Sequence, residues 1–593
     1  MKGLISINLF KQNSFFLMRQ ILILFFLFLS KFLVSQTNII STNVSAEQVM
    51  LGNYNPATYQ ATTILNHPNI ISQGIHAEVS SDSLKKYIIA LAAFGNRNSG
   101  SDTISSTFGI GAARRWVFQK FSEFSSVNEN RLLPSYLQFD RQICSVNKHR
   151  NIFAVLPGLD TTDKRIIIIE AHLDSRCEVL CDSLCSAEGV EDNATGTALV
   201  LELARVMSNY SYNQTLVFLV TIAEEQGLYG AEAFADYCTT KGITIKAVQN
   251  NDVIGGVICG YTASPPGCTS PNAIDSIGVR LFSFGSFNSP HKGYARFIKL
   301  EYKEMIDPIS VVHTAIRIQS PEDRTGRGGD HQPFRQHIFT AMRFTSANEH
   351  GDANVSDTAY HDRQHTTRDT LGIDTNNDNV IDSFFVDFNY LSRNAIINGN
   401  AAGMAAIGPA TPDFNLSVND SALIIHVTQQ TQYNVYRVGV RTLSNDWDSV
   451  YTFVGALDDT IYVAPAAWYY VSIAAVDTNG IESIFSKEYK TTPLGIDDIK
   501  INNSGISLLQ NRPNPFDEAT YILYQVDRMP TYKSAFIRVT DMNGKLIKDI
   551  PTQIQMGSNE VLFEHGYGSI GVLNYSLIID GNIHSSKQMI FAN

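Results

Sequence analysis

The sequence has few cysteines and no basic cluster, and each shortage excludes a class of protein. Seven cysteines among 593 residues are too few for a fold built on disulfides, and all lie between Cys144 and Cys268. Basic residues (45) are outnumbered by acidic ones (57) and are spread along the chain, which argues against a nucleic-acid-binding surface. Charged residues make up only 17% and hydrophobic residues 44%, which excludes a disordered or collagen-like chain.

Long apolar runs are also scarce, and the strongest one lies at the amino terminus. Arg19 precedes an apolar run from Ile21 to Leu29, and Ser35 follows it closely. A basic start, about 7–15 apolar residues and a small residue at the end are typical of a secretory signal peptide. We therefore expect residues 1–36 to be a signal peptide, with Met18 as an alternative start and a membrane anchor as the alternative interpretation. No other stretch is long and apolar enough to span a membrane.

Export changes how the cysteines are interpreted, because an oxidising compartment favours disulfides over metal-binding thiolates. Three of them, Cys177, Cys181 and Cys185, lie in one short segment. Another two, Cys259 and Cys268, flank a Pro-Pro-Gly turn. We expect disulfides here, although an odd count leaves at least one thiol unpaired and the connectivity stays open.

The chain is long enough for roughly three or four domains at about 100–200 residues each. Residues 37–78 are polar and turn-rich, which predicts an N-terminal extension or a propeptide. Residues 79–407 alternate between two patterns. Apolar positions have helical spacing in Ser83–Phe94, Gly109–Phe121, Thr197–Met207 and Phe384–Ile407. Short apolar runs predict strands at Arg165–Glu170, Thr215–Thr221, Val253–Ile258, Val311–Arg317 and Ile338–Phe344. Apolar strands between helices indicate an α/β domain with a mixed, mostly parallel sheet sandwiched by helices.

Two small all-β domains are expected after the α/β domain. Residues 408–495 alternate without helical periodicity, and the run Tyr469–Asp477 resembles the late strands of a fibronectin type III module. Past a polar linker, residues 506–593 open with Leu509–Phe516 (LQNRPNPF) and later contain Val539–Lys545 (VTDMNGK). These motifs resemble the C-terminal sorting domain of the type IX secretion system, and another adhesive β-module is the alternative. The resemblance implies passage through the periplasm to a secreted or cell-surface location, with the type IX machinery as a partner.

Five polar motifs punctuate the α/β region, each after a strand or in a connecting loop. They are His172-Leu173-Asp174, Asp192-Asn193, Glu224-Glu225-Gln226-Gly227, Asn251-Asp252 and Gln364-His365-Thr366. Each alone has a structural explanation, and Asp192, for example, precedes a helix that it would cap. Their joint occurrence at successive strand ends indicates one site, because α/β sheets gather their sites at the carboxyl ends of strands.

The residue types within these motifs suit metal chemistry. Alternate side chains of a strand share a face, so an imidazole at His172 can ligate a metal while Asp174 orients the ring. The neighbouring carboxylates of Glu224 and Glu225 repel each other unless a cation or a proton lies between them. Two neighbours on a strand also point in different directions, so one can ligate while the other moves protons.

Together the motifs resemble those of the secreted co-catalytic di-zinc aminopeptidases, whose relatives include glutamate-carboxypeptidase-type enzymes and glutaminyl cyclases. The resemblance spans roughly residues 80–406 and includes Gly329–Phe334 (GDHQPF), similar to the family's Ser-Asp-His-x-Pro-Phe stretch. It implies the zinc exopeptidase fold and a metal site for two zinc ions. The implied ligands are His172 and Asp252 for one zinc, Glu225 and His365 for the other, and Asp192 as the bridge.

The resemblance also implies two catalytic roles outside the ligand set. Asp174 supports His172, and Glu224 is the general base. Nitrogen and carboxylate ligands suit a catalytic zinc, and water in such a site has a pKa near about 7. Glu224 then takes a proton from that water and returns it to the leaving amine.

The chain departs from the family pattern just before the last zinc histidine, where a tyrosine is usual and Gln364 stands here. We expect Gln364 or the nearby Tyr360 to stabilise the oxyanion, and His331 to be a substrate contact or a hydrogen-bonded loop histidine. A separate segment, Asp374–Asp382, places Asp374, Asn376, Asp378 and Asp382 at the spacing of a calcium loop. A solvated polar loop is the alternative there, because the usual glycine is absent.

These features predict a secreted zinc aminopeptidase that acts on peptides or proteins. Carboxypeptidase or glutaminyl cyclase activity would use nearly the same protein groups, so both stay open. A catalytically inactive receptor is a further alternative, against which stands the presence of Glu224 and all five implied ligands.

Overall fold

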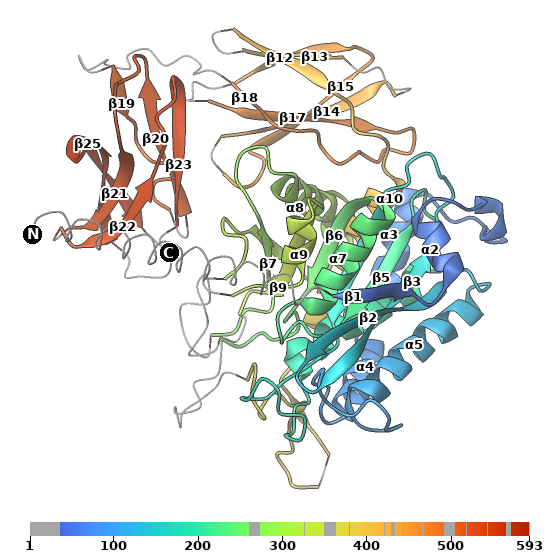
Figure 1. Cartoon of the computed structure of the whole chain (residues 1–593). Coiled ribbons are helices and arrows are strands. Elements are labelled where there is room, and N and C mark those ends of the chain that lie inside the picture. The colour runs from blue at the N-terminus through green and yellow to red at the C-terminus, as the bar shows by residue number, and fades with distance from the viewer. Residues whose placement is uncertain are drawn as a thin grey trace, which may run out of the picture.

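An α/β domain and two all-β domains follow one another along the chain (Figure 1). The computed structural model describes residues 36–593 apart from 260–272, 325–326, 349–362, 379, 420–421, 429–432, 443, 464–467, 492–504, 517–518, 543, 565–570 and 592–593. The predicted signal peptide lies outside the described residues except for Gln36, and so does most of the predicted polar linker. Every helix in the described part of the chain is too short or too polar to cross a bilayer.

A nine-stranded sheet forms the centre of the α/β domain, in the order β1-β2-β3-β5-β4-β6-β9-β7-β8. Its strands are β1 (Thr37–Ser41), β2 (Leu133–Ile143), β3 (Val146–Leu156), β4 (Ile166–His172), β5 (Leu216–Thr221), β6 (Ile245–Asn251), β7 (Gly278–Ser283), β8 (Ala315–Ile318) and β9 (Ala341–Ser346). The central strands β5, β4, β6 and β9 are parallel, whereas β1, β2 and β3 pair antiparallel. The prediction of a mixed sheet with a parallel centre is confirmed.

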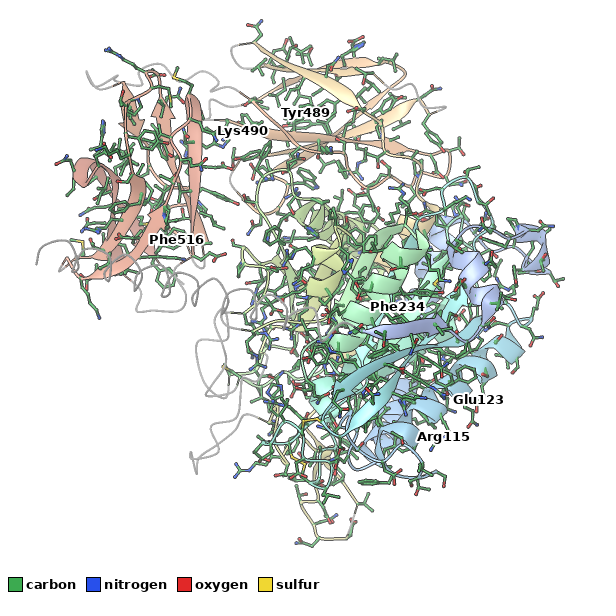
Figure 2. The ribbon with its side chains drawn as sticks, in the orientation of Figure 1. Arg115, Glu123, Phe234, Tyr489, Lys490 and Phe516 are labelled. Atoms are coloured by element: carbon green, nitrogen blue, oxygen red, sulfur yellow. A yellow bond between two sulfur atoms is a disulfide. The ribbon has the colours of Figure 1, made fainter. Side chains whose placement is uncertain are left out.

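Helices cover both faces of this sheet. One face carries α3 (Pro68–Glu78), α4 (Ser81–Ala92), α5 (Gly109–Val127), α6 (Thr195–Met207) and α10 (Phe388–Ile407). The other carries α2 (Val44–Met50), α7 (Tyr229–Lys241) and α9 (His331–Gln336), and α8 (Pro290–Glu301) packs near β7 and β8. Phe234 of α7, labelled in Figure 2, packs edge-on against Phe153 of β3 with ring centroids 5.4 Å apart. The site-bearing strands are thus buried between two helical layers.

The helices begin where the sequence supplies a cap. The Ser80 side chain accepts a hydrogen bond from the backbone of Ser83 at the start of α4, and Asp387 does the same for Tyr390 in α10. The predicted helices therefore form, although α10 begins at Phe388 instead of Phe384.

Two of the predicted strands are displaced in the structure. Val253–Ile258 is not a strand, and β6 runs just before it, over Ile245–Asn251. The strand was missed because it contains Lys246, Gln249 and Asn250, polar residues that are nevertheless buried. Lys246, for instance, donates from Nζ to the carbonyl of Ala405 at 2.7 Å. Hydrogen bonds of this kind allow polar side chains to be buried, so this strand lacks the apolar run by which a buried strand is recognised in a sequence.

The second displaced strand is β8, which runs over Ala315–Ile318 instead of the expected Val311–Arg317. Val311 is 96% exposed, so the apolar start of that run lies on the surface. The antiparallel pair β2 and β3 was not predicted, because polar side chains occupy many of the partly buried positions that alternate with buried ones in β2.

Residues 37–78 are packed into the α/β domain. β1 is the edge strand beside β2, and Ile71 and Ile75 of α3 are fully buried in the core. This segment therefore contributes to the folded domain as an extension packed on it.

Each C-terminal domain has a three-stranded and a four-stranded sheet. The first contains β12 (Phe414–Asn419), β13 (Ala422–Val427), β14 (Val435–Arg441), β15 (Ser449–Val454), β16 (Asp458–Tyr462), β17 (Tyr470–Val476) and β18 (Tyr489–Lys490). The second contains β19 (Ile506–Leu508), β20 (Ala519–Val526), β21 (Ala535–Asp541), β22 (Leu546–Pro551), β23 (Gly557–Glu564), β24 (Gly571–Ile579) and β25 (Asn582–Phe591). The expected all-β character of this part of the chain is confirmed, while the fibronectin-like and sorting assignments stay predictions.

Candidate metal centre

Five side chains from separate segments converge at the carboxyl ends of β4, β5 and β6. His172 is the last residue of β4, Asp252 directly follows β6, and Glu225 lies in the loop between β5 and α7. Asp192 belongs to an irregular turn, Val190–Ala194, ahead of α6, and His365 lies in the loop before β10 (Gly372–Ile373). Parallel strands open their loops on one edge of a sheet, which is why residues so distant in sequence meet here.

The first group of ligands consists of His172, Asp192 and Asp252. His172 Nε2 lies 3.2 Å from Asp192 Oδ1 and 3.4 Å from Asp252 Oδ1. The His172 ring is fully buried, and its Nε2 makes no hydrogen bond. A buried ring nitrogen directed at two carboxylates is the arrangement that a cation would complete.

The second group consists of Asp192, Glu225 and His365. His365 Nε2 lies 3.1 Å from Asp192 Oδ2 and 3.1 Å from Glu225 Oε2. Within each group, one donor atom per residue lies within 4.8 Å of the others. Asp192 therefore faces one group with Oδ1 and the other with Oδ2, so the two groups share a carboxylate.

Neighbouring groups hold the ligands in place. His172 Nδ1 lies 3.0 Å from the backbone carbonyl of Asp174 and 3.6 Å from its carboxylate. The Asp174 carboxylate accepts hydrogen bonds from the backbone N–H groups of Glu224 and Glu225, both at 3.2 Å. The expected support of His172 by Asp174 thus runs through the backbone oxygen, while the Asp174 carboxylate positions the Glu224-Glu225 turn.

Asp252 and Asp192 have partners of their own. Arg343 of β9 donates from Nη2 to Asp252 Oδ2 at 3.1 Å. The buried Asp369 carboxylate accepts from the backbone N–H groups of Glu191 at 2.8 Å and Asp192 at 3.0 Å. The bond from Arg343 fixes the direction of the Asp252 carboxylate, and the bonds to Asp369 fix the backbone from which the Asp192 side chain projects, as expected around a metal centre.

The electrostatics of the site demand positive charge. Burial alone would lower the pKa of His172, but Asp174, Asp192 and Asp252 hold that pKa well above its ordinary range. Burial, reinforced by the carboxylates of Asp252 and Glu225, raises the pKa of Glu224 well above its ordinary value. Divalent cations would supply the positive charge that balances the clustered carboxylates.

The backbone around the site adopts conformations that are rare for non-glycine residues. Ala223, Val253 and His365 have φ angles of 61°, 54° and 61°. Such φ values cost of order 1–3 kcal/mol each and persist where the surrounding structure enforces them. All three lie close to or within the ligand set, so the strained backbone coincides with the candidate site.

A pocket of about 320 Å³ opens over the two groups. Glu224 and Gln364 line it together with four of the five candidate ligands. Gln364 is buried and accepts a hydrogen bond from Arg327 Nη2 at 3.1 Å. Gln364, one of the two expected oxyanion contacts, therefore lines the pocket. The other, Tyr360, lies outside the described residues.

His331 lies away from the described pocket lining. Its ring is buried, and its Nε2 lies 3.1 Å from the carbonyl of Glu322. Burial lowers the pKa of His331 to about 4, so the ring is neutral near pH 7. This geometry fits the loop-histidine alternative better than a substrate contact.

Sequence reasoning missed the arginines of this region. Arg176, Arg324 and Arg327 line the pocket, and Arg343 pairs with Asp252. Two signals were available in the sequence. A charged residue interrupts the apolar strand β9 at Arg343, and Arg176 follows the His172 motif almost directly.

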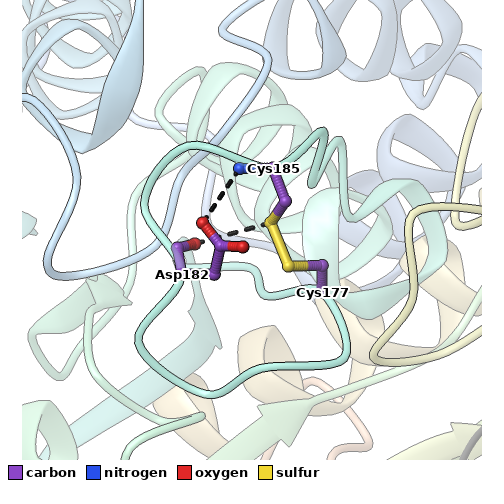
Figure 3. Close-up of side chains that lie close together, drawn as sticks. All are labelled: Cys177, Asp182 and Cys185. Carbon is purple, nitrogen blue, oxygen red and sulfur yellow. Dashed lines mark hydrogen bonds between the residues drawn. A yellow bond between two sulfur atoms is a disulfide. The ribbon is translucent and has the colours of Figure 1, made fainter.

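The cysteine-rich segment beside the pocket is stapled by disulfides. Cys177 bonds to Cys185, as Figure 3 shows, and Cys181 bonds to Cys144. The Asp182 carboxylate accepts a hydrogen bond from the backbone of Cys185, so this cluster is a closed loop and not a thiolate metal site.

The remaining cysteines also follow the expectation of disulfides with one unpaired thiol. Cys259 is disulfide-bonded, and Cys268 lies outside the described residues. Cys238 is free and buried in α7. The preference for disulfides over metal-binding thiolates is therefore confirmed.

The predicted calcium loop uses its carboxylates for local turns. Asp374 Oδ1 accepts from the backbone of Asn376 at 3.2 Å and of Asn377 at 2.7 Å, and Asp382 accepts from Thr375. Among the described residues, none of the metal-sized clusters of His, Cys, Asp and Glu includes Asp374, Asp378 or Asp382. The described geometry fits the solvated loop, and calcium binding stays a prediction.

Part of this chain is similar to proteins of a known family. Residues 151–386 match the family model described as Peptidase family M28. A probable zinc metalloprotease of Leptosphaeria maculans is 28% identical over 389 residues, 62% of this chain and 84% of that protein. Another from Pyrenophora tritici-repentis is 31% identical over 297 residues, 47% of this chain and 66% of that protein.

Solved structures similar to this chain include two bacterial enzymes. The LapA aminopeptidase of Legionella pneumophila has a TM-score of 0.40 at 17% identity, covering 59% of this chain and 79% of that one. The glutaminyl cyclase of Porphyromonas gingivalis has a TM-score of 0.35 at 15% identity, covering 55% and 99%. The family match at residues 151–386 includes both groups of candidate ligands. Residues 151–386, which carry the candidate metal centre, are therefore similar to peptidase family M28.

Proposed function

We propose that this protein is a zinc-dependent exopeptidase, an aminopeptidase that hydrolyses N-terminal peptide bonds. The observation that supports this most is the shared carboxylate, since Asp192 directs one oxygen at His172 and the other at His365. Relatives described as probable zinc metalloproteases add support for the metal.

The donor set suits two zinc ions. His172 and Asp252 would hold one and Glu225 and His365 the other, with Asp192 between them. Imidazole and carboxylate donors in these numbers are typical of catalytic zinc, and a shared carboxylate offsets the repulsion between two cations. When bound, the ions would polarise the scissile carbonyl and make water more acidic.

Glu224 is the residue that moves protons. Its carboxylate lines the pocket next to the ligand groups, and its backbone is held by Asp174. Glu224 accepts a proton from the attacking water at a carboxylate oxygen and returns it to the departing amine. Gln364 lies on the same pocket, where its side-chain amide is the candidate hydrogen-bond donor to the developing oxyanion.

Replacing Glu224 with glutamine tests the general-base role. The change keeps the side chain's shape but removes its ability to accept a proton. We expect turnover to fall by about 10²–10⁴-fold, while the metal content measured by mass spectrometry stays that of the wild type. Substantial residual turnover in the Glu224→Gln variant would refute this role.

Other activities are separated by simple measurements. A glutaminyl cyclase would release no amino acid and would convert an N-terminal glutamine into a ring. A carboxypeptidase would cleave peptides with a blocked amino terminus, which an aminopeptidase leaves intact. An inactive receptor would bind peptides without cleaving any of them, even though the candidate base and ligands are present.

We further propose that the protein is exported through its N-terminal signal peptide and sorted by its last domain. The disulfides of the described chain support this, because such bonds persist in oxidising compartments. The enzyme is then secreted or attached to the cell surface. Residues 506–593 are the proposed contact with the type IX machinery.

A further inference from the structure

The contact between the α/β domain and the first β domain contains an excess of acidic groups. α8 faces this β domain (Figure 1), and Leu300 near the end of α8 packs in a buried cluster with Ala474 of β17 and Phe485. Glu301 directly follows Leu300 in the chain. On the other side of the contact, Arg437 of β14 is the register partner of Ala474. Because this region is buried, each charge in it needs a partner.

Three glutamates gather around Arg437. Its Nη1 donates to Glu304 Oε2 at 2.7 Å and to Glu482 Oε2 at 2.5 Å, and its Nη2 donates to Glu304 Oε1 at 2.6 Å. Glu304 lies in the turn Tyr302–Ile306 after α8, and Glu482 follows β17. The third glutamate is Glu301, whose charge interacts with those of the other three side chains. One guanidinium group therefore serves three carboxyl groups.

Two of these glutamates are buried and incompletely bonded. Glu301 is 2% exposed and Glu482 is 3% exposed. The Oε1 atom of each has no hydrogen-bond partner among the residues that the structure describes. The Glu304 side chain, in contrast, is 43% exposed. Burial disfavours the charged form of a carboxyl group much more than the neutral form.

The surroundings of Glu301 and Glu482 favour a proton on each. Burial raises the pKa of Glu482 to about 7, although Arg437 opposes this effect. Burial, with Glu482 and Glu304 adding to it, raises the pKa of Glu301 well above its ordinary value of 4.5. Tyr294 of α8 also interacts with Glu301, and burial raises the pKa of Tyr294, so its hydroxyl stays neutral where the two carboxyls titrate.

A second group of buried charges in the same contact has the opposite balance. Arg296 Nη2 lies 2.9 Å from Glu488 Oε1, and Arg441 Nε lies 2.5 Å from the same oxygen. Burial raises the pKa of Glu488, but the two arginines outweigh it and hold that pKa below 4.5. Glu488 thus stays ionised where Glu301 and Glu482 titrate, so a response of the contact in that range comes from the latter pair.

We propose that this contact is a pH-sensitive latch, closed while Glu301 and Glu482 are protonated and loosened when they ionise. Ionisation releases two protons to bulk water and leaves three negative charges around the one positive charge of Arg437. Their repulsion then acts across the contact, because Glu301 and Glu304 belong to the α/β domain and Glu482 to the β domain.

The direction of the pH response follows from proton binding. In the open contact, exposed carboxyls titrate near 4.5, whereas the closed contact keeps a proton on Glu482 up to about 7. The closed form thus binds more protons. Its stabilisation is complete below pH 4.5 and is lost as the pH rises through about 7.

Two backbone N–H groups report directly on the opening of the latch. The Asn288 N–H donates to Glu488 Oε2 at 2.9 Å, and the Glu488 N–H donates to Asn288 Oδ1 at 3.0 Å. Both bonds cross between the two domains, so these amides exchange with solvent when the contact opens. Hydrogen–deuterium exchange of the whole protein, read by mass spectrometry with residue-level fragmentation, measures this. Protection factors correct for the effect of pH on the intrinsic exchange rate.

We expect the protection of these two amides to fall by at least about tenfold between about pH 5.5 and about pH 8, because each pKa unit corresponds to a tenfold change. Protection in β4 and β5 should stay constant, since both strands lie in the core of the α/β domain. The double variant Glu301→Gln, Glu482→Gln mimics the protonated carboxyls and cannot ionise. Its pH response should shrink to less than about twofold, whereas Glu482→Gln alone should keep part of the response.

Glu123→Gln is the matched control, because Glu123 lies exposed on α5 and pairs with Lys120 (Figure 2). This variant should respond to pH like the wild type. Constant protection of the Asn288 and Glu488 amides in the wild type would overturn the latch. An undiminished pH response in the double variant would also overturn it. So would an equal loss of protection in β4 and β5, which indicates global unfolding instead of opening at the contact.

Discussion

Asp192 is the residue on which the two candidate metal groups depend. Its two carboxylate oxygens lie 3.2 Å from His172 Nε2 and 3.1 Å from His365 Nε2. The backbone N–H groups of Glu191 and Asp192 donate to the buried Asp369 and hold the segment from which the Asp192 side chain projects. Loss of this carboxylate should therefore affect both groups, whereas loss of Glu225 should affect only one.

The Asp192→Asn substitution tests this difference. Removing the bridging charge leaves two cations without the group that offsets their repulsion, so we expect zinc content to fall towards none. Glu225→Gln should retain about one zinc, because His172, Asp192 and Asp252 still offer the three protein ligands typical of a catalytic site. Metal analysis by mass spectrometry after dialysis measures both, and circular dichroism checks that each variant is folded. Equal metal content in the two variants would contradict the bridging role.

The chemical identity of the site residues was open to prediction from the sequence, but their arrangement was not. His172, Asp192 and Glu225 stand out because they follow apolar strands in recognisable motifs. The left-handed backbone of Val253 leaves no trace in the sequence, because a β-branched residue gives no warning of a positive φ. Arg176 was overlooked for a similar reason, since a lone arginine in a loop is usually solvated.

Strands and helices were predictable in proportion to how apolar they are. β4 and β5 are buried along their whole length and read as apolar runs, so both were expected at the right place. β6 is equally buried but contains Lys246 and Asn250, whose hydrogen bonds satisfy them in the core. A pattern based on hydrophobicity cannot find such a strand, which displaced the prediction to Val253–Ile258.

Helix α8 contacts the first β domain through a cluster of buried charged side chains. Arg296 of α8 donates to Glu488 at 2.9 Å, and Arg441 of β14 pairs with the same carboxylate. All three side chains are nearly inaccessible to solvent. The first β domain is therefore fixed to the peptidase domain through buried charges and not merely tethered to it.

The Glu488→Gln substitution tests this contact. Breaking a buried pair leaves two arginines without their counter-charge, so we expect the free energy of unfolding to fall by about 3–5 kcal/mol. Urea denaturation followed by fluorescence measures the change. Asp549→Asn, which breaks an exposed pair with Arg538, serves as the control and should have little effect.

The same contact predicts a pH dependence. Burial raises the pKa of Glu488, but Arg296 and Arg441 outweigh it and hold that pKa below its ordinary value of 4.5. A carboxyl whose pKa is lowered on folding stabilises the protein above its unfolded pKa and loses that effect as the pH falls through the folded one. The stability difference between wild type and Glu488→Gln should thus shrink below pH 4.5, and a constant difference would contradict the pair.

The two ends of the chain differ in how they pack against the rest of the protein. Residues 37–78 are part of the peptidase domain, because β1 pairs with β2 and α3 lies in the core. The last domain has its own core, and its Tyr521 and Leu523 pack against Trp468 and Tyr470 of the first β domain. Removal of the two ends should therefore have opposite consequences.

Deleting Ile506–Asn593 should leave a folded, active peptidase that stays in the periplasm of the native host. Cell fractionation combined with a peptidase assay measures both properties. Deleting residues 37–78 from the mature chain is the contrasting variant, and it should yield insoluble protein because it exposes the core. Normal surface display without Ile506–Asn593 would remove the sorting proposal.

The most direct measurement is anomalous X-ray diffraction at the zinc edge from crystals of the zinc-loaded protein. We expect two anomalous peaks about 3.5–4 Å apart, with Asp192 between them. His172 and Asp252 should be the ligands of the zinc ion at one peak, and Glu225 and His365 those of the zinc ion at the other. A single peak, or peaks away from these five side chains, would contradict the two-zinc site.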